Sequence, residues 1–415
     1  MDIPDRTYTL VRCHQVVDYR GVRERVNVTI EDGTITRVGG EVEGDEVDCS
    51  DLVVMPGLVN SHTHASMLAL RGYFDDGELE DWLKRMWEAE DKFTDELMYV
   101  SAELAVIEML SSGTTAFVDM YFNPNQIKDL SEKYGIRASA GYTVLRGLDP
   151  EEAVKKTRSL GKSDLFTPVV NVHSIYAVGL DALTRVRDLL TGGERIHIHV
   201  SETRAEIFSV KKRYGLFPVE LLWREGLIPH IQAVHLGWVT SWEIELLKSS
   251  PGVTHCPTSN MKLATGGSFP FKEMWEAGVN ITLGTDGPAS NNSLDMFREM
   301  RTAVLLQRHS YWNTWVKAQH VLRASTMNGY RLFKVNGGLI EPGHVADLVL
   351  LNRYDLVPAL NNRTISHLVY HLTGNSVEKV IVRGRMVYRR GMFEERKRKL
   401  VEKLEEILAG RLREV

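Results

Sequence analysis

The 415-residue chain is poor in cysteine, has no excess of positive charge and contains no long apolar run. Its three cysteines, Cys13, Cys49 and Cys256, form no C-x-x-C pair, which argues against a disulfide framework and against a cysteine-based zinc knuckle. The formal net charge of -5 provides no basic footprint for a nucleic acid. No apolar run approaches the ~18 residues that span a bilayer, and the first residues lack a basic-then-apolar signal. We therefore expect a cytoplasmic protein with neither a nucleic-acid nor a membrane partner.

Both ends of the chain have the alternating pattern of short β-strands. Residues 1–55 alternate apolar and polar positions around the turn dipeptide Asp32-Gly33, and residues 345–392 repeat the pattern in ADLVLLN and VEKVIVRGRMVYRRG. We expect these two blocks to pair into one small β-sandwich composed from both termini. Residues 393–415 are predicted to form a C-terminal helix, with the basic run 396–399 on a solvated face.

The segment 56–344 alternates short β-branched runs with helical segments. The eight runs are GLVNSHTH, TTAFVDMY, IRASAGYTV, TPVVNVHSIYAV, RIHIHVSET, QAVHLGWV, GVTHCPTSN and NITLGTDG. Because each parallel connection needs a crossover helix, this order predicts an α/β fold with a TIM-like (β/α)8 barrel. An open doubly wound sheet is the competing arrangement, but the chain has no Gly-x-Gly-x-x-Gly phosphate loop.

The stretch PGLVNSHTHASM places His62 and His64 two residues apart, directly after an apolar segment. In a strand, residues i and i+2 point to the same side, so the two imidazoles converge. His199, His235 and Asp286 lie near the ends of three further runs. The carboxyl ends of barrel strands meet at one mouth, where barrel enzymes carry out their chemistry. These five side chains are therefore candidate metal ligands.

The composition of this set indicates which metal it suits. Any three of these four imidazoles together with the carboxylate suit zinc or, less specifically, Fe2+, whereas hard cations need more oxygen ligands. The run TPVVNVHSIYAV has no lysine, so a carbamylated lysine that would bridge two metals has no obvious source. We expect one Zn2+ per subunit.

Glu202 lies three residues after His199, where the chain should leave the strand for a loop. A carboxylate there can reach a metal-bound water and carry a proton to a poor leaving group such as ammonia. The alternative interpretation is a surface glutamate that starts the next helix.

The ordered series PGLVNSHTH, HVSET, AVHLG, HCPTSNMKL and TLGTDGPASNNSLDMFREMR resembles the amidohydrolase superfamily. Within that superfamily it resembles the branch of 5-methylthioadenosine/S-adenosylhomocysteine deaminases, and the resemblance spans nearly the whole chain. It implies hydrolytic deamination of an adenosine derivative to the inosine analogue and ammonia. The implied substrates are 5′-methylthioadenosine, S-adenosylhomocysteine, 5′-deoxyadenosine and adenosine.

The resemblance also implies a role for individual residues. His62, His64, His199 and Asp286 would hold one zinc, His235 would lie beside the water, and Glu202 would shuttle a proton to the purine ring. The implied substrate contacts are Glu90 to a ribose hydroxyl, His173 to the nucleoside, Trp82 as an apolar wall, and Ser290 with Asn291 along the base. In the implied mechanism Asp286 accepts a proton during the attack and His235 steadies the developing oxyanion.

Other functions remain open at this point. A guanine- or 8-oxoguanine-type deaminase shares the logic of ring hydrolysis and is compatible with HCPTSN. A triazine-type hydrolase would use the same metal on a halide or amine leaving group. A non-catalytic scaffold would have lost ligands, whereas this chain keeps them all. A homo-oligomer is compatible with the sequence, which does not specify one.

The segment IRASAGYTVLRGLDPEE bears on the 5′ end of the nucleoside. In members that accept S-adenosylhomocysteine, arginines in this region can pair with its carboxylate. Here Tyr142 stands where an arginine is expected, and Arg146 is the nearest candidate. A tyrosine suits an uncharged methylthio or methyl group, so we expect a preference for such substrates. The alternative is that Arg146 reaches the carboxylate and does the same work.

Overall fold

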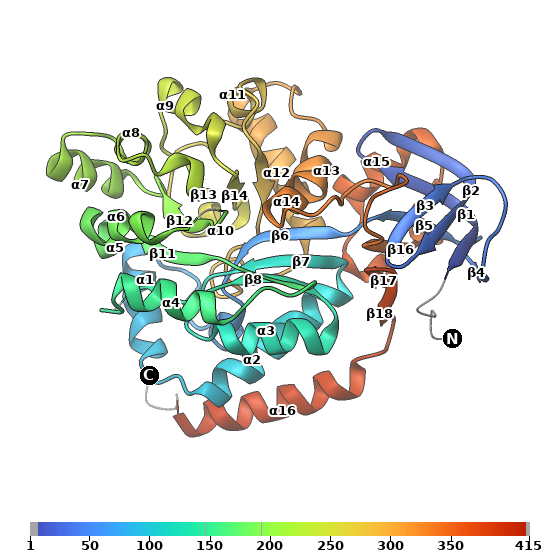
Figure 1. Cartoon of the computed structure of the whole chain (residues 1–415), viewed down its shortest axis with the longest axis horizontal. Helices are drawn as coiled ribbons and strands as arrows, with labels where there is room; N and C mark the ends of the chain where they lie inside the picture. The colour runs from blue at the N-terminus through green and yellow to red at the C-terminus, as the bar shows by residue number, and fades with distance from the viewer. Residues whose placement is uncertain (1–6, 146, 192, 412–415) are drawn as a thin grey trace.

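The computed structural model describes residues 7–145, 147–191 and 193–411. A large body of strands and helices carries a smaller β-rich lobe on one side, and this lobe contains segments from near both ends of the chain (Figure 1). Among the described residues, no helix is both long enough and apolar enough to cross a membrane.

The lobe is built on one mixed sheet. Its strands are β1 (Tyr8–Asp18), β2 (Gly21–Glu31), β3 (Thr34–Val38), β4 (Asp45–Asp48), β5 (Leu52–Pro56), β16 (Leu348–Asn352), β17 (Val377–Val382) and β18 (Arg385–Arg389). The order is β18-β17-β16-β5-β1-β2-β3, and β4 pairs with β1. β16 runs antiparallel to β5, with Leu348 opposite Pro56, so the two ends of the chain share this sheet. Asp32 and Gly33, at φ 47° and 75°, form the predicted tight turn between β2 and β3.

The body contains parallel strands, and each of the eight predicted runs contributes to them. The strands are β6 (Leu58–Thr63), β7 (Thr114–Asp119), β8 (Arg137–Ala140), β9 (Thr143–Val144), β10 (Phe166–Pro168), β11 (Val170–Ser174), β12 (Ile196–Val200), β13 (Ile231–His235), β14 (Gly252–His255) and β15 (Ile281–Leu283). They pair in the orders β10-β8-β7-β6 and β15-β14-β13-β12-β11-β9. Beyond β15, the Asp286 amide donates to the His62 carbonyl at 2.9 Å. The carboxyl ends of the first and last of these strands therefore lie side by side.

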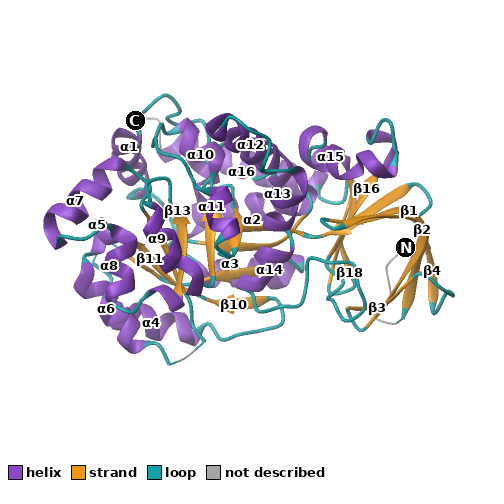
Figure 2. Cartoon of the chain, turned by 90° about the horizontal axis from the view of Figure 1, so that it is seen from above, coloured by secondary structure: helices purple, strands orange, loops and turns teal. Residues whose placement is uncertain are grey.

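Helices connect the strands and cover their outer side (Figure 2). They are α1 (Leu79–Glu90), α2 (Asp95–Ser111), α3 (Pro124–Tyr134), α4 (Pro150–Ser159), α5 (Ile175–Val178), α6 (Leu180–Leu189), α7 (Arg204–Tyr214), α8 (Pro218–Arg224), α9 (Ser241–Leu246), α10 (Pro257–Lys262), α11 (Phe271–Glu276), α12 (Met296–Tyr311), α13 (Ala318–Ser325), α14 (Met327–Leu332), α15 (Thr364–Ser366) and α16 (Glu394–Arg411). Local signals set several boundaries. The Thr203 side chain accepts from the Glu206 amide where α7 begins, and the left-handed Gly215 follows its end.

The C-terminal helix α16 packs along α2, with Leu400 and Leu404 buried. The prediction of a solvated basic run needs a correction at Arg396. Its Nε and Nη2 atoms donate to the two carboxylate oxygens of Glu103 in α2, at 2.9 and 2.7 Å. The Glu103 side chain is fully buried, and a buried carboxylate needs a cationic partner.

Candidate functional site

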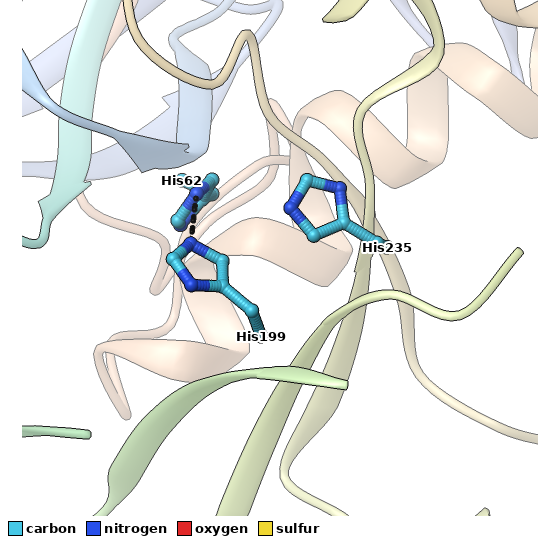
Figure 3. Close-up of side chains that lie close together, drawn as sticks. All are labelled: His62, His199 and His235. Atoms are coloured by element: carbon cyan, nitrogen blue, oxygen red, sulfur yellow. Dashed lines mark hydrogen bonds between the residues drawn. The ribbon is translucent and has the colours of Figure 1, made fainter. Parts of the chain in front are cut away.

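The predicted ligands converge at the carboxyl ends of the body's parallel strands. His62 lies near the end of β6, His64 follows that strand, His199 and His235 lie at the ends of β12 and β13, and Asp286 follows β15. Figure 3 shows the rings of His62, His199 and His235 pointing toward one another. Side chains from four strands thus meet in one small volume.

The donor atoms of this group are close enough to share one ion. Asp286 Oδ1 lies 3.2 Å from His62 Nε2 and 3.1 Å from His64 Nε2. His199 Nε2 lies 3.2 Å from His62 Nε2. His64 Nδ1 lies 2.6 Å from the Met120 carbonyl. Because a carbonyl only accepts, Nδ1 carries the hydrogen, and in the neutral ring Nε2 presents a lone pair. Several imidazole nitrogens and one carboxylate, all at short range and little exposed, form a donor set that fits a metal ion.

The carboxylate of Asp286 is held in place from several directions. Its Oδ1 accepts from the Gly287 amide at 2.9 Å, and its Oδ2 accepts from the Ser259 hydroxyl at 2.7 Å. Burial acts to raise its pKa, but the adjoining His62 and His64 outweigh burial and hold the pKa of Asp286 well below its usual range. The group is therefore an ionised acceptor within the cluster.

The pKa of Glu202 is shifted in the opposite direction from that of Asp286. Burial, reinforced by the negative charge of Asp286, raises the pKa of Glu202 to about 8. Its Oε1 lies 3.5 Å from His235 Nε2. At neutral pH this side chain is predominantly a carboxylic acid with a proton to give.

The orientation of His235 follows from its neighbour Asn260. The Asn260 amide nitrogen lies 3.1 Å from His235 Nδ1 and donates to it, so the neutral ring carries its hydrogen on Nε2. Burial lowers the pKa of His235, which favours this neutral form. The Nε2 hydrogen therefore faces the region between Glu202 and Asp286, whose Oδ2 is 4.0 Å away.

Sequence reasoning did not identify Glu206, which holds the loop that carries Glu202. The two carboxylate oxygens of Glu206 accept from the amides of Ser201 and Glu202, both at 2.9 Å. Ser201 has a φ of 53°, an unfavourable value that these contacts help to maintain. The only signal in the sequence is a glutamate in the first turn of α7, and such residues are common at helix starts.

A pocket opens beside the cluster and reaches His64, His199, Glu202, His235 and Asp286. Its apolar walls include Leu79, Trp82, Leu83, Met86, Phe122 and Leu263. The buried indole N–H of Trp82 has no partner among the described residues. Glu90 and His173 also line the pocket: the Tyr121 hydroxyl donates to Glu90 Oε1 at 2.8 Å, and His173 Nδ1 lies 3.0 Å from the Ser174 hydroxyl. The pocket thus combines an apolar slot with polar groups at its ends.

Ser290, which the sequence predicted to line the base, lies in the loop after Asp286. It is buried outside the lining of this pocket, and its hydroxyl donates to the Gly287 carbonyl at 3.1 Å. The neighbouring Asn291 uses its amide on the Thr285 carbonyl and on Glu299. Both side chains therefore fold the loop after Asp286. Arg146 lies outside the described residues.

Tyr142 lines an adjoining cavity together with Glu90, Phe122 and Thr143. Its hydroxyl accepts from the side-chain amide of Asn125 at 2.8 Å. Glu90, Phe122 and Thr143 also line the pocket beside the cluster, so the two spaces share a wall.

Comparison with known proteins adds relatives of nearly full length. Residues 53–387 match the model of the amidohydrolase family. A 5-methylthioadenosine/S-adenosylhomocysteine deaminase of Archaeoglobus fulgidus is 38% identical over 414 residues, which cover 96% of this chain and 98% of that protein. A 5′-deoxyadenosine deaminase of Methanothermobacter thermautotrophicus is 38% identical over 428 residues, which cover 98% and 99%.

Solved structures also resemble this chain over nearly its full length. An adenosine deaminase from Xanthomonas campestris with bound zinc superposes with a TM-score of 0.88 at 30% identity, covering 96% of this chain and 98% of that one. A zinc complex of atrazine chlorohydrolase from Arthrobacter aurescens has a TM-score of 0.84 at 19% identity, covering 95% and 99%, and at this identity the likeness concerns the fold alone. From its family match, its full-length relatives and its structural likeness, the chain belongs to the amidohydrolase family.

Proposed function

We propose that this protein hydrolyses the C6 amino group of an adenosine derivative, releasing ammonia and the inosine analogue. Relatives at 38% identity carry the names 5-methylthioadenosine/S-adenosylhomocysteine deaminase and 5′-deoxyadenosine deaminase, which supports this substrate class. The observation that carries the proposal is the pair of carboxyl groups beside the histidine cluster. Both line the pocket beside the cluster, and their surroundings lower the pKa of Asp286 and raise the pKa of Glu202, which suits the one proton acceptor and one proton donor that hydrolysis of a ring amidine needs.

The metal in this proposal is one zinc ion, held by His62, His64, His199 and Asp286. Their nitrogen and oxygen donors suit zinc, and Fe2+ fits the same set less specifically. A related adenosine deaminase structure contains bound zinc. Zinc in such a site supplies the Lewis acidity that makes water nucleophilic near neutral pH.

The protein groups then divide the proton transfers. Asp286 accepts a proton from the attacking water, and Glu202 donates its proton to the ring nitrogen next to C6, which makes the ring a better electrophile. His235, with its hydrogen on Nε2, donates to the oxygen on which negative charge develops. The proton on Asp286 passes to the amino group, and the C–N bond breaks so that ammonia leaves as a neutral molecule. As the C6 carbonyl forms, the proton of the added hydroxyl returns to Glu202, so both carboxyl groups regain their starting states.

The pocket beside the cluster accommodates the nucleoside. Its apolar slot, with Trp82 as one wall, suits a purine ring, and the Trp82 N–H offers a free donor to a bound ligand. Glu90 accepts from a ribose hydroxyl and His173 contacts the same nucleoside, because both line the pocket. Ser290 is not among the proposed contacts, since its hydroxyl is committed to the loop.

The same proposal includes the domain organisation. We infer that the described part of residues 56–344 forms one closed (β/α)8 barrel and that the described residues of 1–55 and 345–392 form a composite β-sandwich, followed by the helix α16 (Glu394–Arg411). The contact of the Asp286 amide with the His62 carbonyl supports closure between the last and first barrel strands. The pairing of β5 with β16 supports the composite lobe.

A substrate panel tests the function. Purified protein is assayed for ammonia release from the four adenosine derivatives named above and from guanine, and for chloride release from a chloro-triazine, with protein stripped of metal as the control. We expect ammonia from adenosine derivatives, lost on stripping and restored by zinc. Release from guanine with none from any adenosine derivative would refute the proposed substrate class.

A further inference from the structure

A chain of three buried polar side chains extends from the histidine cluster into the interior of the body. His62 Nδ1 lies 2.8 Å from His197 Nε2, and His197 Nδ1 lies 3.0 Å from Asn171 Oδ1. The Asn171 amide nitrogen donates to the carbonyls of Asp119 at 3.0 Å and Gly141 at 2.9 Å. All three side-chain residues are fully buried, and they come from β6, β12 and β11.

The Asp119 and Gly141 carbonyls determine where each hydrogen lies in this series of hydrogen bonds. A carbonyl only accepts, so the Asn171 group that faces both of them is its NH2, and the group that faces His197 is its oxygen. His197 Nδ1 must then carry a hydrogen to donate to that oxygen, and in the neutral ring Nε2 is left as an acceptor. His62 Nδ1 must therefore carry the hydrogen that His197 Nε2 accepts.

The consequence appears at the opposite side of the His62 ring. With its hydrogen on Nδ1, the neutral ring has a bare Nε2, and this is the atom 3.2 Å from Asp286 Oδ1 and 3.2 Å from His199 Nε2. The other tautomer would place a hydrogen on Nε2 and leave two acceptors facing each other between His62 and His197. We propose that Asn171 and His197 are positioning residues that set the tautomer of His62 and present its Nε2 to the metal.

This inference rests on the proposed metal site but concerns residues outside it. Neither His197 nor Asn171 lines the pocket beside the cluster, so neither is expected to touch substrate. Hydrogen-bonded partners of metal-binding histidines typically contribute about 10–100-fold to metal affinity. Loss of the hydrogen bonds that join Asn171, His197 and His62 should therefore weaken zinc binding, with little change in KM for protein saturated with zinc.

The test compares zinc dissociation constants, measured by chelator competition on apoprotein, for the wild type, His197→Phe and His197→Gln. Phenylalanine fills the space without an acceptor, so we expect Kd to rise about 10–100-fold. Glutamine keeps an acceptor for His62 Nδ1–H and should recover most of the affinity. His255→Phe is the matched control, because His255 is a buried histidine of β14 that stacks on Phe269 and is not hydrogen-bonded to His62 or His197. Its replacement should leave Kd within about twofold of the wild-type value.

A second measurement does not depend on whether the His197 variants fold. In the 15N-histidine NMR spectrum of wild-type apoprotein, the His62 ring, assigned by its loss in His62→Gln, should show the Nδ1–H form. A His62 ring in the Nε2–H form, or a folded His197→Phe variant with wild-type Kd, would overturn the inference. Wild-type protein that binds no zinc would instead refute the proposed function, so the two failures are distinguishable.

Discussion

The buried ion pair between Arg137 and Asp347 provides a quantitative test of how the β-rich lobe is joined to the body. Arg137 lies in β8, and Asp347 immediately precedes β16. Their side chains are 5% and 0% exposed. Arg137 donates from Nε to Asp347 Oδ2 and from Nη2 to Oδ1, and Asp347 also accepts from the Tyr330 hydroxyl at 3.0 Å and the Arg383 amide at 2.7 Å.

Asp347→Ala removes every one of these acceptors and leaves a guanidinium buried without its counter-ion. Breaking a buried pair in this way costs about 3–5 kcal/mol, because the remaining charge is not compensated. With an m-value of about 3 kcal/mol/M in urea, the unfolding midpoint should fall by about 1 to 1.7 M. Asp347→Asn keeps an acceptor for the Arg383 amide, so its urea midpoint should fall less than that of Asp347→Ala.

The assay is equilibrium urea unfolding followed by circular dichroism. Glu152→Ala is the control, because it breaks the exposed pair of Glu152 and Lys156 in α4, whose side chains are 51% and 48% exposed. Such an exposed pair contributes little to stability, because solvent and salt screen it. If Asp347→Ala shifts the midpoint no further than Glu152→Ala does, the energetic reasoning for this pair is wrong.

Four further predictions concern the site and the C-terminal helix. His199→Ala or Asp286→Ala should lose both zinc and turnover while the circular dichroism stays native, and full zinc occupancy with normal rate in either variant would contradict the site assignment. Glu202→Gln should keep its zinc, measured by metal analysis, yet lose about 10²–10⁴ in kcat, since an amide cannot relay a proton; a loss below about tenfold would mean that the proton takes another route. Measured kcat/KM should be higher for 5′-methylthioadenosine, 5′-deoxyadenosine or adenosine than for S-adenosylhomocysteine, and the preference is wrong if S-adenosylhomocysteine is best and Arg146→Ala selectively loses it. Burial acts to raise the pKa of Glu103, but its bonds to Arg396 and Lys133 outweigh burial and lower the pKa below the ordinary value. The stabilisation by ionised Glu103 should therefore be complete above its unfolded pKa of about 4.3 and disappear as the pH falls through the lower pKa of the folded state. Across this acid range, the urea midpoint of Glu103→Gln should vary less with pH than that of the wild type.

The sequence by itself determined the features that depend on neighbouring residues. Alternation and β-branched runs placed the strands, the Asp32-Gly33 dipeptide placed a turn, and the i, i+2 spacing put His62 and His64 on one side of the chain. These features follow from the geometry of a single strand or turn, which acts over a few residues. The order of the motifs then indicated the family.

Only the tertiary structure decided which side chains meet across the strands. Asn171, His197 and His62 form one hydrogen-bonded chain because the register of strands far apart in sequence brings them together, and periodicity predicts a face but not a partner. The loop after β15 turns the Ser290 hydroxyl onto its own backbone rather than into the pocket. The run at 396–399 looked fully solvated because the carboxylate that needs Arg396 lies on another helix. In each case the deciding contact joins groups whose orientation is set by packing, which the local pattern of the sequence does not encode.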